Sequence, residues 1–141
     1  MAASPDPSLL YVTDFSDASL EALHWAIPEA LKHHLHFSVL YPFRLDQVRR
    51  KDNAVLSKKD IDRDASEKFE GLMENLLKSN KLTYDFHSEV GFLRDRIADH
   101  IRKNNVAMLV IGKNQVSEES FPELVQELNI PLVIVPSKKR Q

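Results

Sequence analysis

Residues 9–16 read LLYVTDFS, and the rest of the fold follows outward from them. The first five are a short apolar run of strand-forming residues that stops at Asp14, as a buried parallel strand does. Ser16 can then cap a following helix, with Asp17 favourably placed in its first turn. The chain therefore opens like a nucleotide-binding α/β domain.

Four further strands are predicted, alternating with helices. The strands cover residues 35–41, 82–89, 106–111 and 132–135, and apolar residues at helical spacing mark helices around 20–31, 61–76, 93–101 and 121–128. Pro42 closes the second strand, and Ser120 and Glu123 form a capping box before the last helix. Alternation of Tyr84 and Phe86 with polar neighbours favours an edge position for the third strand, whereas the apolar fourth strand favours a central one. This order predicts an α/β fold in which one parallel sheet carries helices on both faces.

The stretch that would hold phosphate is missing. A phosphate cradle needs backbone N–H groups that point at the ligand, which usually requires several glycines in one loop. The chain has three glycines, far apart at Gly71, Gly91 and Gly112, and residues 113–120 read KNQVSEES. The sequence therefore predicts a nucleotide-binding type of fold without the nucleotide.

Composition limits the other classes of function. The chain has 141 residues, 43% of them hydrophobic, which predicts one globular domain over residues 1–141. A net charge of −2 gives no general attraction to nucleic acid or acidic membranes, and the absence of cysteine excludes disulfides and thiolate sites. Residues 1–7 lack the pattern of a secretory signal, and no apolar run is long enough to span a bilayer. We expect a cytoplasmic protein without a nucleic-acid or membrane partner.

Four segments together resemble the universal stress protein family. They are Tyr11–Ser19, the Glu89–Gly91 step before the third helix, Met108–Gly112 and Ile130–Pro136. Each is short, but their order and spacing are fairly specific and cover nearly the whole chain. The resemblance implies a three-layer, Rossmann-like sandwich with strand order 3-2-1-4-5, in which ligands bind at the switch point between the first and fourth strands.

The resemblance also implies where a nucleotide would lie. Family members that bind ATP hold adenine and ribose with residues after the first two strands, and the phosphates with a glycine-rich loop after the fourth. The matching positions are Thr13 and Asp14 after the first strand, Leu40 for the apolar adenine contact, and Gly112 for the first loop glycine, followed by Lys113. These five residues are the candidate binding residues.

The match to the phosphate loop ends soon after Gly112. Gln115 stands where the second glycine belongs, and its side chain obstructs close approach of the backbone to a phosphate. Glu118 and Glu119 fall near the expected glycine and hydroxyl pair, where carboxylates repel a triphosphate. We expect no cofactor and no metal. The alternative is an adenine nucleotide, ATP with Mg²⁺, held in an altered loop with slow hydrolysis.

Some candidate residues admit two interpretations. Asp14 can hydrogen-bond a ribose or serve a turn, and Lys113 can contact an anion or remain solvated. The histidines at 33, 34 and 36 straddle a helix end and a strand start, which favours a charge at the helix terminus over a metal site. Trp25 lies off the apolar face of the first helix, so it either packs under a loop or marks a contact surface.

No signature of acyl transfer, zinc hydrolysis or P-loop chemistry is present, so we expect no catalytic residues and no enzyme. A receiver domain shares the five-stranded plan. It needs an acidic pair after the first strand and an aspartate after the third, where this chain has Ser88 and Glu89. A regulatory or interaction protein in the stress response is the remaining interpretation.

The fifth predicted strand, Leu132–Val135, is a sheet edge with apolar residues on both faces, which invites pairing with another chain. In the family that this chain resembles, the corresponding strand pairs with its copy in a second subunit and gives a two-fold dimer. We therefore expect a homodimer through this strand, together with a protein partner of unknown identity.

Overall fold

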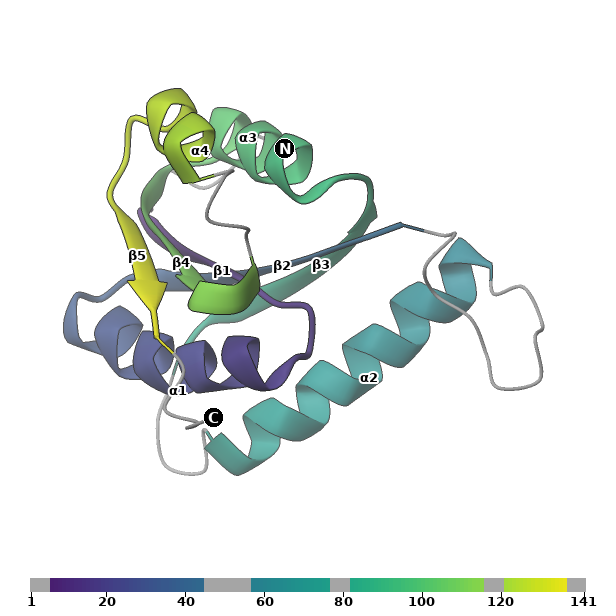
Figure 1. The fold of residues 1–141 in the computed structure, drawn as a ribbon. Coiled ribbons are helices and arrows are strands. Elements are labelled where there is room, and N and C mark those ends of the chain that lie inside the picture. Colours follow the sequence, from purple (N-terminus) through teal and green to yellow (C-terminus); the bar gives the residue numbers. More distant parts are fainter. Residues whose placement is uncertain (1–5, 45–56, 77–81, 116–120, 137–141) are drawn as a thin grey trace.

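The computed structural model describes residues 6–44, 57–76, 82–115 and 121–136, so the predicted roles of Glu118, Glu119 and Ser120 lie outside the described residues. The strands are β1 (Ser8–Val12), β2 (His36–Phe43), β3 (Tyr84–Val90), β4 (Val106–Gly112) and β5 (Leu132–Val135). The helices are α1 (Asp17–Lys32), α2 (Lys58–Leu76), α3 (Leu93–Lys103) and α4 (Phe121–Glu127), with a short 3-10 turn, η2 (Lys113–Gln115). Every predicted strand and helix is present in the predicted order (Figure 1).

The strands form one parallel sheet in the order β3-β2-β1-β4-β5, as predicted. β1 lies in the centre with a strand along each edge, and its residues from Leu9 to Val12 are fully buried because both faces of the strand pack into apolar cores. β2 and β4 lie on opposite sides of β1, so the chain direction across the sheet reverses there. The carboxyl ends of β1 and β4 are therefore the switch point of the sheet.

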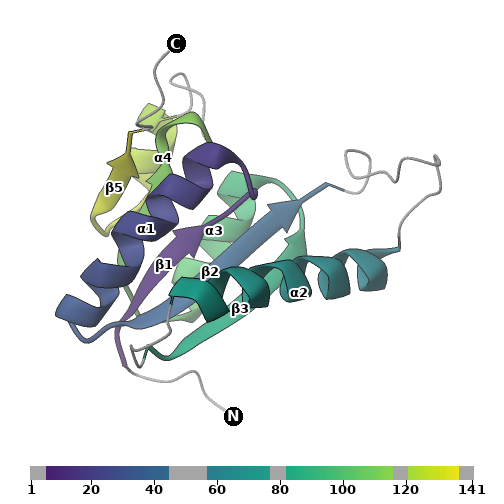
Figure 2. The same cartoon turned by 90° about the horizontal axis from the view of Figure 1, so that it is seen from below.

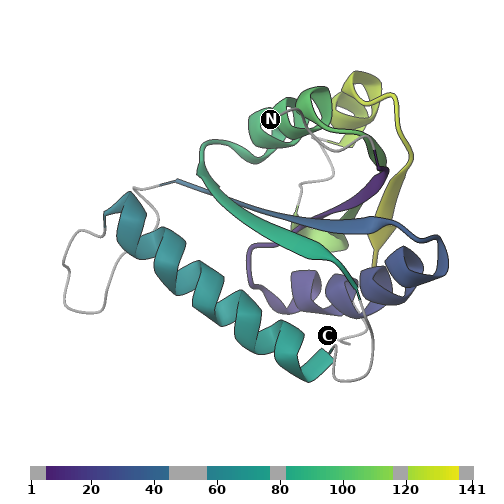
Figure 3. The same cartoon turned by 180° about the vertical axis from the view of Figure 1, so that it is seen from behind.

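Helices cover both faces of the sheet and make three layers. α1 and α2 lie on one face, and α3 and α4 lie on the other (Figures 1 and 3). Figure 2 looks onto the face that α1 and α2 cover. Alternate residues of β2 enter different cores: Phe37 and Val39 pack on the side of α1 and α2, whereas Leu40 joins the cluster that contains Ile97 of α3.

The second strand continues past Pro42 to Phe43, so the prediction that Pro42 closes it is wrong. The backbone N–H and C=O groups of even-numbered β2 residues point toward β1, as the hydrogen bond from Thr13 N to Leu40 O shows. The backbone groups of odd-numbered residues point toward the side of β3, where Gly91 N donates to Phe43 O. β1 ends at Val12, so no strand residue of β1 lies beside position 42 to accept a hydrogen bond. Proline, which lacks the backbone N–H, is therefore tolerated there.

The predicted cap and edge positions are confirmed. Ser16 caps α1, and its Oγ accepts a hydrogen bond from Ser19 N at 3.2 Å. β3 is an edge strand with mostly half-buried side chains, and β5 is the other edge. In the part of the chain that the structure describes, no helix combines the length and apolar character needed to cross a membrane.

Candidate functional site

A small pocket lies at the carboxyl ends of the strands, beside the switch point. It has a volume of about 160 Å³ and is lined by Thr13, Asp14, Pro42, Phe43, Arg44, Gly91, Leu93 and Gln115. We call it the switch-point pocket. Of the candidate binding residues, Thr13 and Asp14 line it, whereas Leu40, Gly112 and Lys113 do not.

Thr13 is buried and its hydroxyl is used within the protein. Its Oγ1 accepts a hydrogen bond from Phe15 N at 3.0 Å and lies 3.2 Å from Ser19 Oγ. Because Ser19 Oγ donates its own proton to Ser16 O, the proton between the two hydroxyls belongs to Thr13. Thr13 thus fastens the turn after β1 to the first turn of α1.

Asp14 is exposed and closes the same turn. Its Oδ1 accepts a hydrogen bond from Ser16 N at 2.9 Å, which is the geometry of an Asx turn. The turn holds Phe15 at a φ of 62°, where its ring packs edge-on against Tyr41 at 5.1 Å. Asp14 therefore serves the turn, one of its two predicted roles, and it also lines the switch-point pocket.

The other candidate residues lie around the pocket in structural positions. Leu40 is fully buried in the core beneath α3, and Lys113 is exposed at the start of η2. Gly112 is needed for packing, because a Cβ added there would meet the backbone O of Ala18 at 2.7 Å and its carbonyl carbon at 2.9 Å. The lack of a side chain lets the start of α1 approach the end of β4.

Gln115 bridges the two strands of the switch point. Its Oε1 accepts a hydrogen bond from Gly112 N, and its Nε2 donates one to Val12 O at 2.9 Å. The side chain thereby satisfies a backbone donor at the end of β4 and a backbone acceptor at the end of β1. From the sequence, Gln115 is visible only as the residue that replaces a glycine. The available signal for its role was a carboxamide three positions after Gly112, within reach of the strand end.

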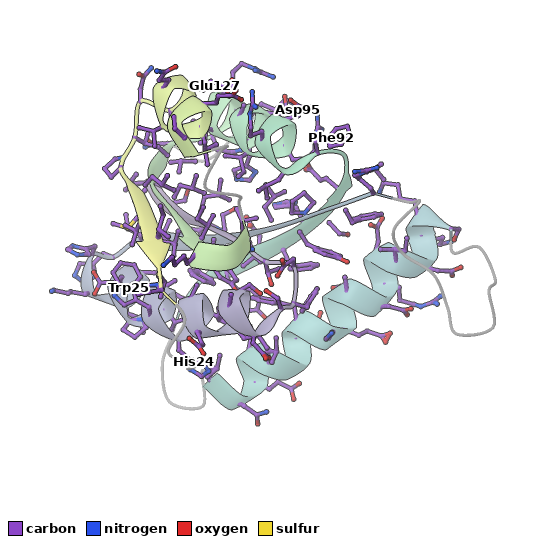
Figure 4. All side chains as sticks on the ribbon, viewed as in Figure 1. His24, Trp25, Phe92, Asp95 and Glu127 are labelled. Carbon is purple, nitrogen blue, oxygen red and sulfur yellow. The ribbon has the colours of Figure 1, made fainter. Side chains whose placement is uncertain are left out.

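The predicted surface features are also located. Trp25 is 37% exposed on α1, and Phe92 is 60% exposed at the start of α3 (Figure 4). The guanidinium carbon of Arg44 lies over the Phe92 ring, 4.9 Å from its centre. His33 and His34 are exposed where α1 ends. His36 begins β2, and its ring nitrogens contact Thr83 and Asp85. Among the described residues, no group of three or more His, Cys, Asp or Glu side chains is placed to hold a metal ion.

Comparison with known proteins decides the family. The sequence profile of the Universal stress protein family matches residues 8–136. The chain belongs to this family. A search of curated protein sequences finds no significant match.

Solved universal stress proteins share the fold at low sequence identity. UspA from Lactobacillus plantarum has a TM-score of 0.73 at 13% identity, covering 94% of this chain and 99% of that chain. A family protein from Burkholderia pseudomallei has a TM-score of 0.69 at 15% identity, covering 95% and 98%. The universal stress protein from Archaeoglobus fulgidus in complex with dAMP has a TM-score of 0.66 at 16% identity, covering 94% and 99%.

In this universal stress protein, the groups at the switch point are mostly engaged with one another. The Thr13 hydroxyl, one oxygen of Asp14 and the carboxamide of Gln115 all hold turns or strand ends. The pocket volume, about 160 Å³, is below the roughly 300 Å³ at which pockets for small organic ligands begin. The arrangement is suited to holding β1, β4 and α1 together.

Proposed function

We propose that this universal stress protein is a regulatory or interaction protein that does not bind ATP tightly and is not an enzyme. The supporting observation is the bridge made by Gln115. A nucleotide at the switch point would have to displace two hydrogen bonds, each worth about 1 kcal/mol net. It would also have to enlarge a pocket that is too small for it as it stands.

An adenine nucleotide is the second candidate ligand. Arg44, which carries a positive charge, lines the switch-point pocket together with Asp14. The Archaeoglobus fulgidus relative, which has the same fold, is described in complex with dAMP. This candidate requires the Gln115 side chain to move out of the crevice.

Calorimetry with ATP and Mg²⁺ separates the two candidates. We expect no binding tighter than a Kd of about 10 μM, which corresponds to roughly 7 kcal/mol. We also expect Asp14→Ala to leave the titration unchanged, since Asp14 serves the turn. A tighter Kd in the parent protein that Asp14→Ala weakens would establish the nucleotide-binding candidate instead.

We further propose that two copies associate through β5. This strand is an edge of the sheet, and Ile134 is 36% exposed on it. α1 contacts β5, and Figure 4 places the exposed Trp25 on the same side of the molecule. An apolar edge next to an exposed tryptophan favours a self-complementary contact over an edge left in water.

Ile134→Lys is expected to convert the dimer to a monomer. An isologous contact buries Ile134 twice, so the dissociation constant should rise by more than about tenfold. Analytical ultracentrifugation over micromolar concentrations measures this change. Val90→Lys, which alters a similarly exposed residue on the opposite edge strand, is the matched control and should leave the dimer intact. A parent protein that is monomeric throughout this range would contradict the proposed assembly.

A further inference from the structure

A polar cluster joins β2, β3 and α3, away from the switch-point pocket and toward the amino ends of the strands. It consists of His36 and Ser38 on β2, Asp85 and His87 on β3, and His100 on α3. On each strand the two residues are two positions apart, so their side chains lie on the same face of the sheet, the one that α3 covers. We call this group the histidine cluster.

Asp85 is the centre of the histidine cluster. His36 Nε2 lies 3.0 Å from Oδ2, while Ser38 Oγ donates to Oδ1 at 2.8 Å and His87 Nε2 lies 3.3 Å from Oδ1. Burial raises the pKa of Asp85, but the hydrogen bonds from His87, His36 and Ser38 outweigh burial and bring the pKa well below its usual range. The carboxylate is therefore ionised at every pH at which histidines titrate.

His100 is connected to this carboxylate through Ser38. Its side chain is buried, with the residue 8% exposed, and its Nε2 lies 3.2 Å from Ser38 Oγ. Because Ser38 gives its only proton to Asp85, it must accept the hydrogen bond from the Nε2–H of His100. A neutral imidazole thus completes the chain His100, Ser38, Asp85 without any extra charge.

Two histidines of the cluster compete for positive charge. The hydrogen bond to Asp85 raises the pKa of His87. The rings of His87 and His100 are 5.9 Å apart, and burial together with the nearby His87 lowers the pKa of His100. His87 therefore holds its proton more tightly than an ordinary histidine, and His100 holds one less tightly.

Other charged groups lie near the cluster, but their attraction for a proton on His100 is weaker than the opposing effects of burial and His87. Asp99 on α3 is already paired with Arg96, Arg102 and Lys103 at 3.8, 2.5 and 3.1 Å. The same Arg96 lies 3.9 Å from Glu89 on β3. Asp6, from the segment before β1, lines the adjoining pocket of about 190 Å³ with His36, Ser38, Asp85 and His100. Asp85, Glu89 and Asp99 all attract a proton to His100, but burial and His87 outweigh them and keep its pKa below the ordinary value.

We propose that the histidine cluster is a proton-sensitive clasp. It keeps a proton on His87, excludes a second proton from His100, and releases α3 from β2 and β3 when acidification forces His100 to become charged. A buried imidazolium at His100 would be poorly solvated and would be repelled by the charge on His87. Separation of α3 from Ser38 would relieve both effects, and the adjoining pocket gives water a route to the ring. This inference is independent of what the switch-point pocket binds.

His100 and His87 change the stability of the folded protein with pH in opposite ways. The folded protein binds the His100 proton less tightly than the unfolded chain, so the stability it gives is present above pH 6.5 and is lost as pH falls below that value. The stability from His87 is present below pH 6.5 and is lost as pH rises through its raised pKa. Loss of the Asp85 contribution begins only near its ordinary pKa of about 3.9. Of these three groups, only His100 changes its contribution to stability as pH falls just below 6.5.

Native-state hydrogen exchange of the α3 amides in residues 97–103 tests the clasp. After correction for intrinsic exchange, the opening constant should increase as pH falls from 6.5 toward 5, by at most about tenfold per pH unit because one proton is taken up on opening. His100→Gln keeps a donor for Ser38 but does not titrate, so its opening constant should be independent of pH in this interval. His24→Gln, which alters an exposed histidine on α1, is the matched control and should behave as the parent protein (Figure 4).

An NMR titration of the parent protein gives a second measurement that does not depend on any variant. The His100 ring should titrate below pH 6.5 and the His87 ring above it. In His87→Gln, the His100 ring should titrate at higher pH than in the parent. The clasp is excluded if the parent opening constant does not change with pH, if His100→Gln keeps the parent slope, or if His100 titrates at or above pH 6.5.

Discussion

Gly112→Ala is expected to lower the free energy of unfolding by about 3 kcal/mol, because the added methyl group would overlap backbone atoms. The ideal Cβ lies 2.7 Å from Ala18 O and 2.9 Å from Ala18 C, and neither atom can turn away as a side chain can. Relief requires α1 to move from the end of β4. Urea denaturation followed by circular dichroism measures the loss.

The matched control is Gly71→Ala, which makes the same chemical change in the opposite circumstances. Gly71 lies within α2, and nothing is within 4 Å of the Cβ that alanine would add. This variant should gain about 0.5 to 1 kcal/mol, since alanine is the better helix former. Equal stabilities for the two variants would contradict a packing role for Gly112.

Gln115→Ala is expected to do two things at once. It should lose about 2 kcal/mol of stability, since two hydrogen bonds worth about 1 kcal/mol each disappear. It should also make AMP binding at least about tenfold tighter, or roughly 1.4 kcal/mol, because the strand-end groups of Val12 and Gly112 become available to a ligand. AMP is the informative ligand because its short phosphate tail makes little use of the altered loop. Calorimetry measures its affinity, and thermal denaturation measures the stability.

Gln126→Ala is the control for this substitution, since Gln126 is exposed on α4. It should change neither the stability by more than about 0.5 kcal/mol nor the affinity for AMP. If Gln115→Ala is destabilised but binds AMP no better than the parent, Gln115 is a structural bridge and does not exclude the ligand. If the parent already binds AMP as tightly as the variant, the crevice is open without any substitution.

Local sequence signals predicted the framework well. The run from Leu9 to Thr13 became the buried central strand, and Ser16 became the cap of α1 because a hydroxyl at that position satisfies a helix N–H in most settings. The edge position and the polar face of β3 followed from the alternation around Tyr84 and Phe86. The strand order depended on the family resemblance, since periodicity alone does not state which strands are neighbours.

The site was harder to predict because it depends on how distant segments are brought together. Ser38 and Asp85 are opposite one another in the register of β2 and β3, yet they are separated by 47 positions in the chain. His100 reaches Ser38 over 62 positions. The bridge from Gln115 to Val12 spans 103. No local pattern encodes such contacts, so the sequence marked the missing glycine but not the side chain that fills its place.

The two borders of the sheet differ in character, and this difference limits how many copies can join. β5 presents Ile134, whereas β3 carries Asp85, His87 and Glu89 along one face. Once a twofold contact has used the apolar border of each copy, the remaining borders carry ionisable groups that discourage further strand addition. Association through β5 would thus stop at a closed pair and would not propagate into a filament.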